Sequence, residues 1–289
     1  MASPAFCSCC WRSPPVVKEL IPPQPAPPAP PFEWTRLHIL GAVLLGFWIL
    51  AGIALVAWLV GAWDPDKVAT YGPKLVSGLG VTLTLVSISI SLGALLSVPI
   101  AFGRMSKNRL LSSFAYGYVY FFRGTPLIAQ LFLIYYGFGS FRDQLDALGL
   151  WVFFRDAWNC ALLAFTLNTA AYQAEILRGA IESVPRGQHE GAAALGLTPF
   201  QTFHRVVLPQ AMIVALRPYG NEIILMIKGS AIVAIVTVFD LFGETRRAYS
   251  RTFDFQIYIW AAVFYLVIVE TLRNIWAKLE QRLTRHLKR

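Results

Sequence analysis

The chain has 289 residues, of which 56% are hydrophobic and 14% are charged, and its formal net charge is +9. A typical soluble domain carries about 25% charged residues, so the composition excludes an ordinary soluble protein. A basic balance of this size needs no nucleic-acid partner when Lys and Arg gather on the cytoplasmic side of a membrane.

The N-terminal segment, residues 1–35, differs from the rest of the chain because seven prolines crowd positions 22–31. Such a stretch is extended or disordered and cannot pack a core, so we expect a cytoplasmic tail. The segment also carries Cys7, Cys9 and Cys10, whereas Cys160 is alone in an apolar run. Structural zinc sites use four ligands at defined spacing, so we predict no metal site.

Six apolar segments follow, and each is close to or above the roughly 20 residues that a helix needs to cross a bilayer. No Asp, Glu, Lys or Arg occurs between Arg36 and Asp64 or between Lys74 and Arg104. The other segments are 112–139, 157–181, 210–238 and 255–275. The pattern predicts an all-α integral membrane protein with six spans. The first span begins too late for a signal peptide, which favours an uncleaved anchor.

The spans differ in character along the chain. The first, within 36–63, has almost no polar side chains, which predicts an accessory helix exposed to lipid. From residue 71 onward the spans carry Gly, Ser, Thr and Asn, as close helix packing in a bilayer requires. We therefore expect a membrane domain over 71–280 and a basic cytoplasmic tail at 281–289.

The distribution of Lys and Arg predicts the orientation. If the N-terminus is cytoplasmic, fifteen Lys and Arg residues lie in inside segments and seven in outside segments. The positive-inside rule then places both termini in the cytoplasm, where the basic tail can lie on anionic lipid.

The segment between the fourth and fifth spans, 182–209, is charged and rich in helix signals. Residues 190–195 predict a short helix that ends at Gly196, a residue suited to a left-handed C-cap. Thr198, Pro199 and Gln201 then match a capping box with proline at the first helical position. We expect two short helices joined by a tight turn, which a cytoplasmic partner grips.

This loop also carries a spaced pattern: Glu190-Gly191-Ala192, then Gly196, then Val206-Val207-Leu208-Pro209. The pattern resembles the signature of membrane subunits of bacterial ABC importers, which reads Glu-Ala-Ala, three residues, Gly, nine residues, Ile, one residue, Leu-Pro. The spacing matches at every fixed position, and Gly191 and Val206 depart in residue type. Gly191 should weaken the short helix by about 1 kcal/mol relative to Ala.

Further segments look like permeases for polar amino acids: 120–127, 130–132, 135–137, 171–181, 184–188 and 208–211, with Asn221-Glu222, Lys228 and Ser230. The resemblance covers about 71–280. Within the family, Asn159-Cys160 and 163–169 look closest to M-type permeases for histidine, other basic amino acids and opines. The resemblance implies a five-helix permease core with one extra N-terminal transmembrane helix, in the inner membrane of a bacterium.

In this family the loop is a coupling helix that docks in a groove of a cytoplasmic ATPase. The resemblance therefore assigns coupling to the matching residues Glu190, Gly191, Ala192, Gly196, Leu208 and Pro209. It implies two ATPase subunits, a periplasmic binding protein that faces the outer loops 61–78, 139–156 and 239–254, and a second permease subunit. The M-type resemblance favours a heterodimer of permeases over a homodimer.

The chain has no phosphate-binding loop of the form G-x-x-x-x-G-K-S/T, which an ATP-hydrolysing subunit needs. We therefore expect the ATPase subunits to bind ATP and Mg²⁺, and we expect this chain to have no cofactor and no catalytic residue.

Ionisable residues inside spans mark functional sites or ion pairs. Glu222 falls near the middle of the fifth span, where a carboxylate would attract the cationic group of a basic substrate. Asn221 beside it, with Lys228 and Ser230 further out on the same helix, completes the predicted substrate path. The alternative is an internal ion pair of Glu222 with Arg217 or Lys228. The sequence does not decide between a substrate contact and an ion pair.

Two local features complete the prediction for the spans. Pro126 follows Arg123 in the third span and cannot donate a backbone hydrogen bond, so a kink is expected. Glu175 and Arg178 lie three residues apart in the fourth span and are expected to form a structural ion pair.

Two other classes of protein compete with this interpretation. An ion-coupled secondary transporter or channel would need no ATPase, but it would show internal repeats, and none is visible between the two halves. A membrane-anchored enzyme would need a catalytic constellation, whereas the four His residues are scattered.

Overall fold

The computed structural model describes residues 35–61 and 63–285, and the proline-rich segment and its three cysteines lie outside the described residues. All regular secondary structure in the described ranges is helical, which confirms the all-α prediction. Contacts divide the chain into two units, residues 1–63 and residues 64–289.

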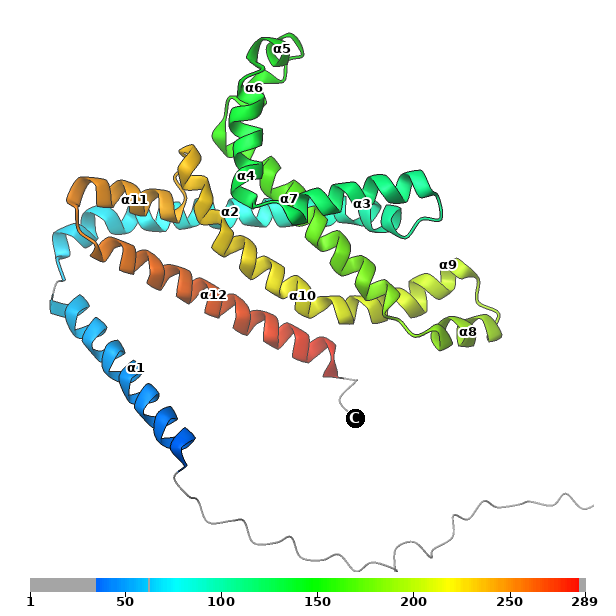
Figure 1. Ribbon diagram of the computed structural model, residues 1–289, viewed down its shortest axis with the longest axis horizontal. Helices are drawn as coiled ribbons and strands as arrows, with labels where there is room; N and C mark the ends of the chain where they lie inside the picture. The colour runs from blue at the N-terminus through cyan, green and yellow to red at the C-terminus, as the bar shows by residue number, and fades with distance from the viewer. Residues whose placement is uncertain (1–34, 62, 286–289) are drawn as a thin grey trace, which may run out of the picture. The chain divides into compact units, whose positions relative to one another are not determined.

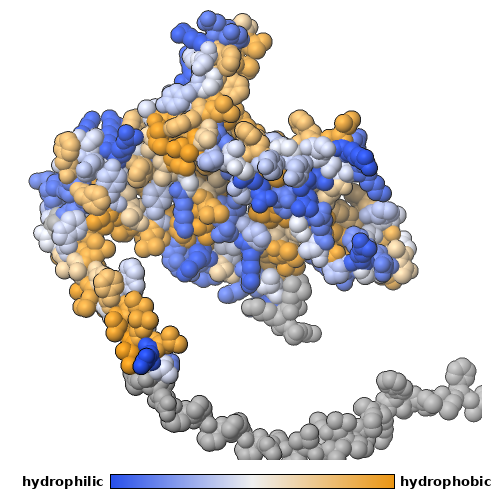
Figure 2. Space-filling model, viewed as in Figure 1, coloured by the Kyte–Doolittle hydropathy of each residue, from blue (hydrophilic) through white to orange (hydrophobic). Residues whose placement is uncertain are grey.

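The first unit contains α1 (Arg36–Gly61), a helix of 26 residues with no buried side chain. Large apolar side chains such as Phe47, Trp48 and Trp58 are exposed along it, and Figure 2 shows that its visible face is apolar. A helix that is apolar on all sides and long enough to span hydrocarbon is stable in contact with lipid.

The second unit is a bundle of helices (Figure 1). In chain order it contains α2 (Pro65–Arg104), α3 (Arg109–Gly124), α4 (Leu127–Phe132), the π-helical η2 (Leu133–Gly137), α5 (Arg142–Ala147), α6 (Trp151–Phe154), α7 (Ala157–Glu182), α8 (Arg186–Ala194), α9 (Pro199–Thr202), the π-helical η3 (Phe203–Val207), α10 (Leu208–Gly229), the 3₁₀-helical η4 (Ser230–Val236), α11 (Leu241–Thr252) and α12 (Gln256–Leu283).

Four helical segments in the described residues are long and apolar enough to cross a membrane: 36–61, 65–104, 199–236 and 256–283. Two of the six predicted spans do not meet this criterion by themselves. The span predicted at 112–139 is divided between α3 and α4–η2, and α7, predicted at 157–181, is 26 residues long but contains many polar side chains.

The polar composition of α7 is explained by its position in the second unit. It packs against α2, α10, α3 and α4, and thirteen of its residues are buried, among them the fully buried Phe165. Polar side chains on a central helix can be satisfied by neighbouring helices and need not face lipid. The low hydropathy of this span is therefore a property of a bundle core.

The crossing of α2 and α7 depends on Gly93. A Cβ atom built at this position would lie 2.5 Å from Thr169 Cγ2 and 3.1 Å from Gln173 Nε2. Only glycine allows the two helices to approach this closely, as small residues do at helix interfaces in membranes.

The predicted kink at Pro126 is a complete break between α3 and α4. Thr125 adopts an extended conformation, with φ −111° and ψ 147°. The Gln130 amide donates hydrogen bonds to the carbonyls of Phe122 and Thr125, and Asn168 of α7 donates to the Gln130 side-chain oxygen at 3.0 Å. The amides therefore satisfy backbone groups that the break would leave unpaired.

The N-terminus of α2 lies earlier in the sequence than predicted, because Asp64 caps the helix and Pro65 occupies its first position. The outer loop predicted at 61–78 is thus mostly helical. The Lys67 ammonium lies 2.6 Å from Asp254, in the turn before α12, and its hydrogen bond lowers the pKa of the Asp254 carboxyl. The pair ties the start of α2 to the start of α12.

We predict that Gly93→Ala destabilises the protein by about 1–3 kcal/mol, the usual cost of overpacking a well-packed core. The matched control is Gly80→Ala on the same helix, where an added Cβ meets no atom within 4 Å. A thermal-stability measurement on the detergent-solubilised protein should show a lower midpoint for Gly93→Ala alone. Equal midpoints for both variants would contradict the close crossing.

Candidate functional site

The predicted coupling loop begins with α8, which starts at Arg186, four residues earlier than expected. Gly196 ends it in the left-handed conformation, with φ +75°. The N–H groups of Gly196 and Leu197 donate to the carbonyls of Ala193 and Ala192, which is the bond pattern of a Schellman C-cap. The local sequence therefore closes this turn as predicted.

The second half of the loop differs from the prediction of a separate short helix. Thr198 and Gln201 form the expected capping box, and Pro199 is the first helical residue. The helix does not stop there, because α9 passes through η3 directly into α10, giving one helical segment over 199–236. No residue between 202 and 208 breaks the helix, and the π-helical turn at Phe203–Val207 absorbs one extra residue.

Most residues of the spaced signature are accessible to a partner. Glu190, Gly191, Gly196 and Pro209 are exposed. Ala192 is buried, with 4% of its surface exposed, so its side chain is not presented to a partner in this structure. Its place inside the turn, where its carbonyl accepts the Leu197 N–H, explains the burial.

Two large apolar residues on this loop were not singled out from the sequence. Leu195 is 82% exposed and Phe200 is 77% exposed. They flank the Gly196 turn, and a pair of large apolar residues beside a tight turn in a charged loop was the available signal. Exposed apolar side chains on an ordered polar loop are typical of a protein-binding surface.

The loop is joined firmly to the bundle. Val184 and Val207, on either side of it, are buried in one cluster with Ala180, Ala211 and Ala215. The side-chain amides of Gln188 and Gln210 are hydrogen-bonded at 3.2 Å. The base of the loop is therefore part of the packed structure, so a force on the loop acts on α7 and α10.

Glu222 lies in a buried hydrogen-bond network between α10 and α7. Only 6% of its surface is exposed, and the Thr169 hydroxyl donates to its carboxylate at 2.9 Å. Gln173 donates to the Thr169 oxygen and to the Ile90 carbonyl of α2. The Gln173 side-chain oxygen is buried without a hydrogen-bond partner, so this network retains an acceptor for a further donor.

The ion pairs considered as the alternative for Glu222 do not form. Arg217 forms an ion pair with Glu280 of α12, and in the described part of the chain the Lys228 side chain has no ion pair or hydrogen bond. The four predicted path residues also lie on different sides of the helix. Asn221 and Lys228 are exposed, whereas Glu222 and Ser230 are buried, and the Ser230 hydroxyl donates to the Ile227 carbonyl.

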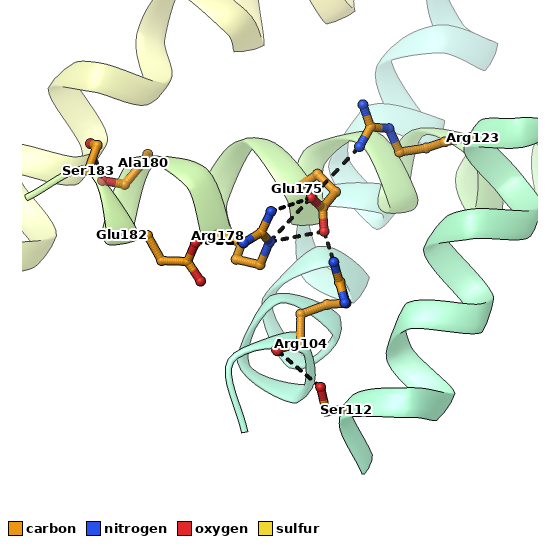
Figure 3. Close-up of polar contacts among 8 residues, drawn as sticks. All are labelled: Arg104, Ser112, Arg123, Glu175, Arg178, Ala180, Glu182 and Ser183. Carbon is orange, nitrogen blue, oxygen red and sulfur yellow. Dashed lines mark hydrogen bonds and ion pairs between the residues drawn. The ribbon is translucent and has the colours of Figure 1, made fainter. Parts of the chain in front are cut away.

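A second charged cluster centres on Glu175 of α7 (Figure 3). The predicted pair with Arg178 is present at 2.8 Å, and Arg104 of α2 approaches the same carboxylate at 2.9 Å. Arg123 of α3 lies further away, at 3.8 Å. One carboxylate thus joins three helices. The sequence predicted only the pair within α7, because the arginines of α2 and α3 come close only in the folded bundle.

A family model described as binding-protein-dependent transport system inner membrane component matches residues 79–286. The chain belongs to this family. It is a membrane permease subunit of an ABC transporter and not the ATP-hydrolysing part, which confirms the sequence prediction. In the described residues, no group of three or more His, Cys, Asp or Glu side chains is placed to hold a metal ion.

Several curated relatives cover most of the permease. The nopaline permease NocM of Agrobacterium fabrum is 45% identical over 75% of this chain and 90% of its own length. The octopine permease OccM of Rhizobium radiobacter is 38% identical over 75% of this chain and 89% of its own length. HisM of Escherichia coli K12, from a histidine/lysine/arginine/ornithine transport system, is 38% identical over 73% and 90%.

Solved structures give the same fold. An amino acid ABC transporter crystallised with histidines has a TM-score of 0.68 and 34% identity, covering 76% of this permease and 99% of that chain. The MetNI methionine transporter has a TM-score of 0.60 at 20% identity, over 73% of this chain and 96% of that chain. This likeness supports the fold alone. The all-α membrane architecture is therefore that of ABC transporter membrane subunits.

We predict that Glu175→Gln destabilises the permease by about 3 kcal/mol, because three arginines lose the charge of a shared, largely buried acceptor. Its carboxylate is 14% exposed. Glu182→Gln is the control, since Glu182 is 51% exposed and contacts Arg178 alone, and exposed pairs contribute about 0–1 kcal/mol. Thermal midpoints of the purified variants test this, and a control as unstable as Glu175→Gln would refute the central role of Glu175.

Proposed function

We propose that this permease forms the translocation path for basic amino acids or opines in an ATP-driven importer. The observation that carries the proposal is the 45% identity to the nopaline permease over three quarters of the chain. Relatives at 38% act in octopine and in histidine, lysine, arginine and ornithine transport systems. All these compounds carry a cationic group, and the buried carboxylate of Glu222 offers a complementary charge.

The path assigned to this chain is centred on Glu222, with Asn221, Lys228 and Ser230 on the same helix. The burial of Glu222 supports a role in substrate binding, because electrostatic attraction is stronger where water is excluded. The free acceptor on Gln173 and the hydroxyl of Thr169 add uncharged hydrogen-bonding groups beside the carboxylate.

Coupling is assigned to the loop 190–209 through Glu190, Gly191, Ala192, Gly196, Leu208 and Pro209. The exposure of Glu190 and of the apolar pair Leu195 and Phe200 supports docking to a cytoplasmic ATPase subunit, which binds ATP and Mg²⁺. Ala192 contributes by closing the turn from inside. Leu195 and Phe200 are added to the docking surface on the ground of their exposure.

The assembly proposed is a heterodimer with a second permease of similar fold, two ATPase subunits and a periplasmic binding protein. Support comes from the relatives, which are M-type subunits. The excess of Lys and Arg in the predicted inside segments supports a cytoplasmic location of both termini, and α1 is assigned as an accessory span outside the domain at 71–280.

We predict that Glu190→Lys lowers the amount of ATPase that co-purifies with the permease. Glu190 is the one acidic residue of α8, and the substitution reverses its charge. Asp143→Lys on α5 is the matched control, since it makes the same charge change on an exposed residue at the opposite end of the second unit. Equal ATPase recovery from the two variants would argue against docking through this loop.

The substrate class is tested by uptake of labelled arginine in cells that express the complete transporter, with unlabelled competitors. We expect histidine, lysine and octopine to compete and glutamate not to compete. Glu222→Gln should raise the KM for arginine about tenfold, since a hydrogen bond to a charged group contributes about 1.5–3 kcal/mol. The variant keeps the acceptor for Thr169, so assembly should be normal. Strong competition by glutamate would refute the substrate class.

A further inference from the structure

A pocket of about 640 Å³ opens at the end of the second unit opposite the coupling loop. Its walls come from η2, the turn between α6 and α7, and the turn between η4 and α11, which lie beside one another in Figure 1. Six lining residues matter here: Tyr135, Arg155, Asp156, Trp158, Thr237 and Phe239. The two turns border the segments 139–156 and 239–254, which the charge distribution places outside the cytoplasm.

Two opposite charges lie next to each other in this pocket. Arg155 ends α6, and Asp156 caps α7. One oxygen of the Asp156 carboxylate accepts the Trp158 N–H at 2.9 Å, which leaves the second oxygen available. Among the described residues the Arg155 side chain has no ion pair or hydrogen bond, so it does not pair with Asp156. Both side chains are exposed to the pocket.

This arrangement complements the backbone of a free amino acid. An α-amino acid carries a carboxylate and an ammonium on one carbon atom, so it needs one cationic and one anionic partner close together. The arginine guanidinium can bind a carboxylate with two parallel hydrogen bonds, and an aspartate oxygen can accept from an ammonium.

Aromatic side chains supply the rest of the wall. Tyr135 and Trp158 line the pocket near the two charges, and aromatic faces attract guanidinium and ammonium groups within about 6 Å. At Phe239 such a contact already exists on the rim, where the Arg247 guanidinium lies 4.9 Å from the ring. Glu244 forms an ion pair with Arg247 at 3.6 Å, so the positive charge of Arg247 at the rim is neutralised.

Thr237 adds an independent observation. It adopts a left-handed conformation with φ 65° and ψ 18°, which is strained for a β-branched residue and costs about 1–3 kcal/mol. Strained residues of this kind are held by the structure around them and cluster at active sites and ligand sites. The residue is exposed and lines the pocket, so its hydroxyl is available to a bound molecule.

We propose that this pocket is an entry site that binds the α-amino acid backbone of the substrate before it reaches Glu222. Arg155 holds the carboxylate, Asp156 holds the ammonium, and Tyr135 and Trp158 contact a cationic side chain. This inference rests on the proposed amino acid transport, and it adds a second site that recognises the part common to all α-amino acids.

The test is a ligand-observed NMR titration of the complete transporter in nanodiscs, without binding protein, in a Glu222→Gln background. That background weakens the buried site about tenfold, so binding at the pocket contributes a larger share of the signal and is identified by the differences between pocket variants. The probes are arginine and agmatine, which is arginine without its carboxylate. The second permease subunit is unchanged in every sample, so differences between variants report on this chain.

Arg155→Gln should weaken arginine binding about tenfold, as expected for loss of a charged hydrogen-bond partner, and should leave agmatine binding unchanged. Asp156→Asn should weaken both ligands, and it remains a good helix N-cap, so α7 keeps its start. Arg142→Gln is the control, because Arg142 stacks on Trp151 and does not line the pocket. Unchanged arginine binding by Arg155→Gln, or an equal loss for agmatine, overturns the proposal.

Failure of the proposed substrate class is a separate outcome. If cells with the wild-type transporter do not take up arginine, the same titration with glutamine still tests the backbone site, since glutamine has the same ammonium and carboxylate. Loss of glutamine binding in Arg155→Gln would support the pocket without a basic substrate. Unchanged glutamine binding would reject the pocket.

Discussion

The close approach of α2 and α7 at Gly93 is the constraint on which the second unit depends. A polar helix such as α7 is costly in a bilayer unless neighbouring helices satisfy its side chains. Gly93 brings α2 near enough for Gln173 to reach the Ile90 carbonyl, and Gln173 in turn supports the Thr169 hydroxyl that donates to Glu222. A buried carboxylate is tolerated on α10 because two other helices provide this chain of donors.

The same helix satisfies a second irregular feature. Asn168 of α7 is one residue before Thr169, and it binds the Gln130 side chain that fills the break between α3 and α4. Since consecutive residues on a helix point in different directions, Asn168 and Thr169 serve two separate neighbours. Further along, Glu175 gathers arginines from α2 and α3. Polar residues on α7 thus organise three contacts along its length.

The sequence predicted the elements whose causes are local. Gly196, the capping box at Thr198 and the break at Pro126 all follow from backbone conformations that neighbouring residues determine. Contacts between distant residues were predicted poorly. The protein partners considered for Glu222, as the alternative to a substrate, were Arg217 and Lys228 on its own helix, whereas its observed partner is Thr169, 53 residues away. The arginines around Glu175 and the pocket at Arg155 and Asp156 likewise arise from packing between helices.

The continuity of the helix from Pro199 to Gly229 links the loop and the buried carboxylate mechanically. A rise of about 1.5 Å per residue places Glu222 roughly 35 Å from the Thr198 cap along one element, and Val207 and Ala211 fix the base of that element against α7. A rigid helix transmits a displacement at one end to the other. The π-helical turn at Phe203–Val207 and Pro218 within α10 are two places where this connection departs from regular α-helical hydrogen bonding. Because Val207 at the end of this turn is buried with Ala180 of α7, a displacement of the coupling loop passes through the turn into α10, and π-helical turns inside α-helices are frequent at functional sites.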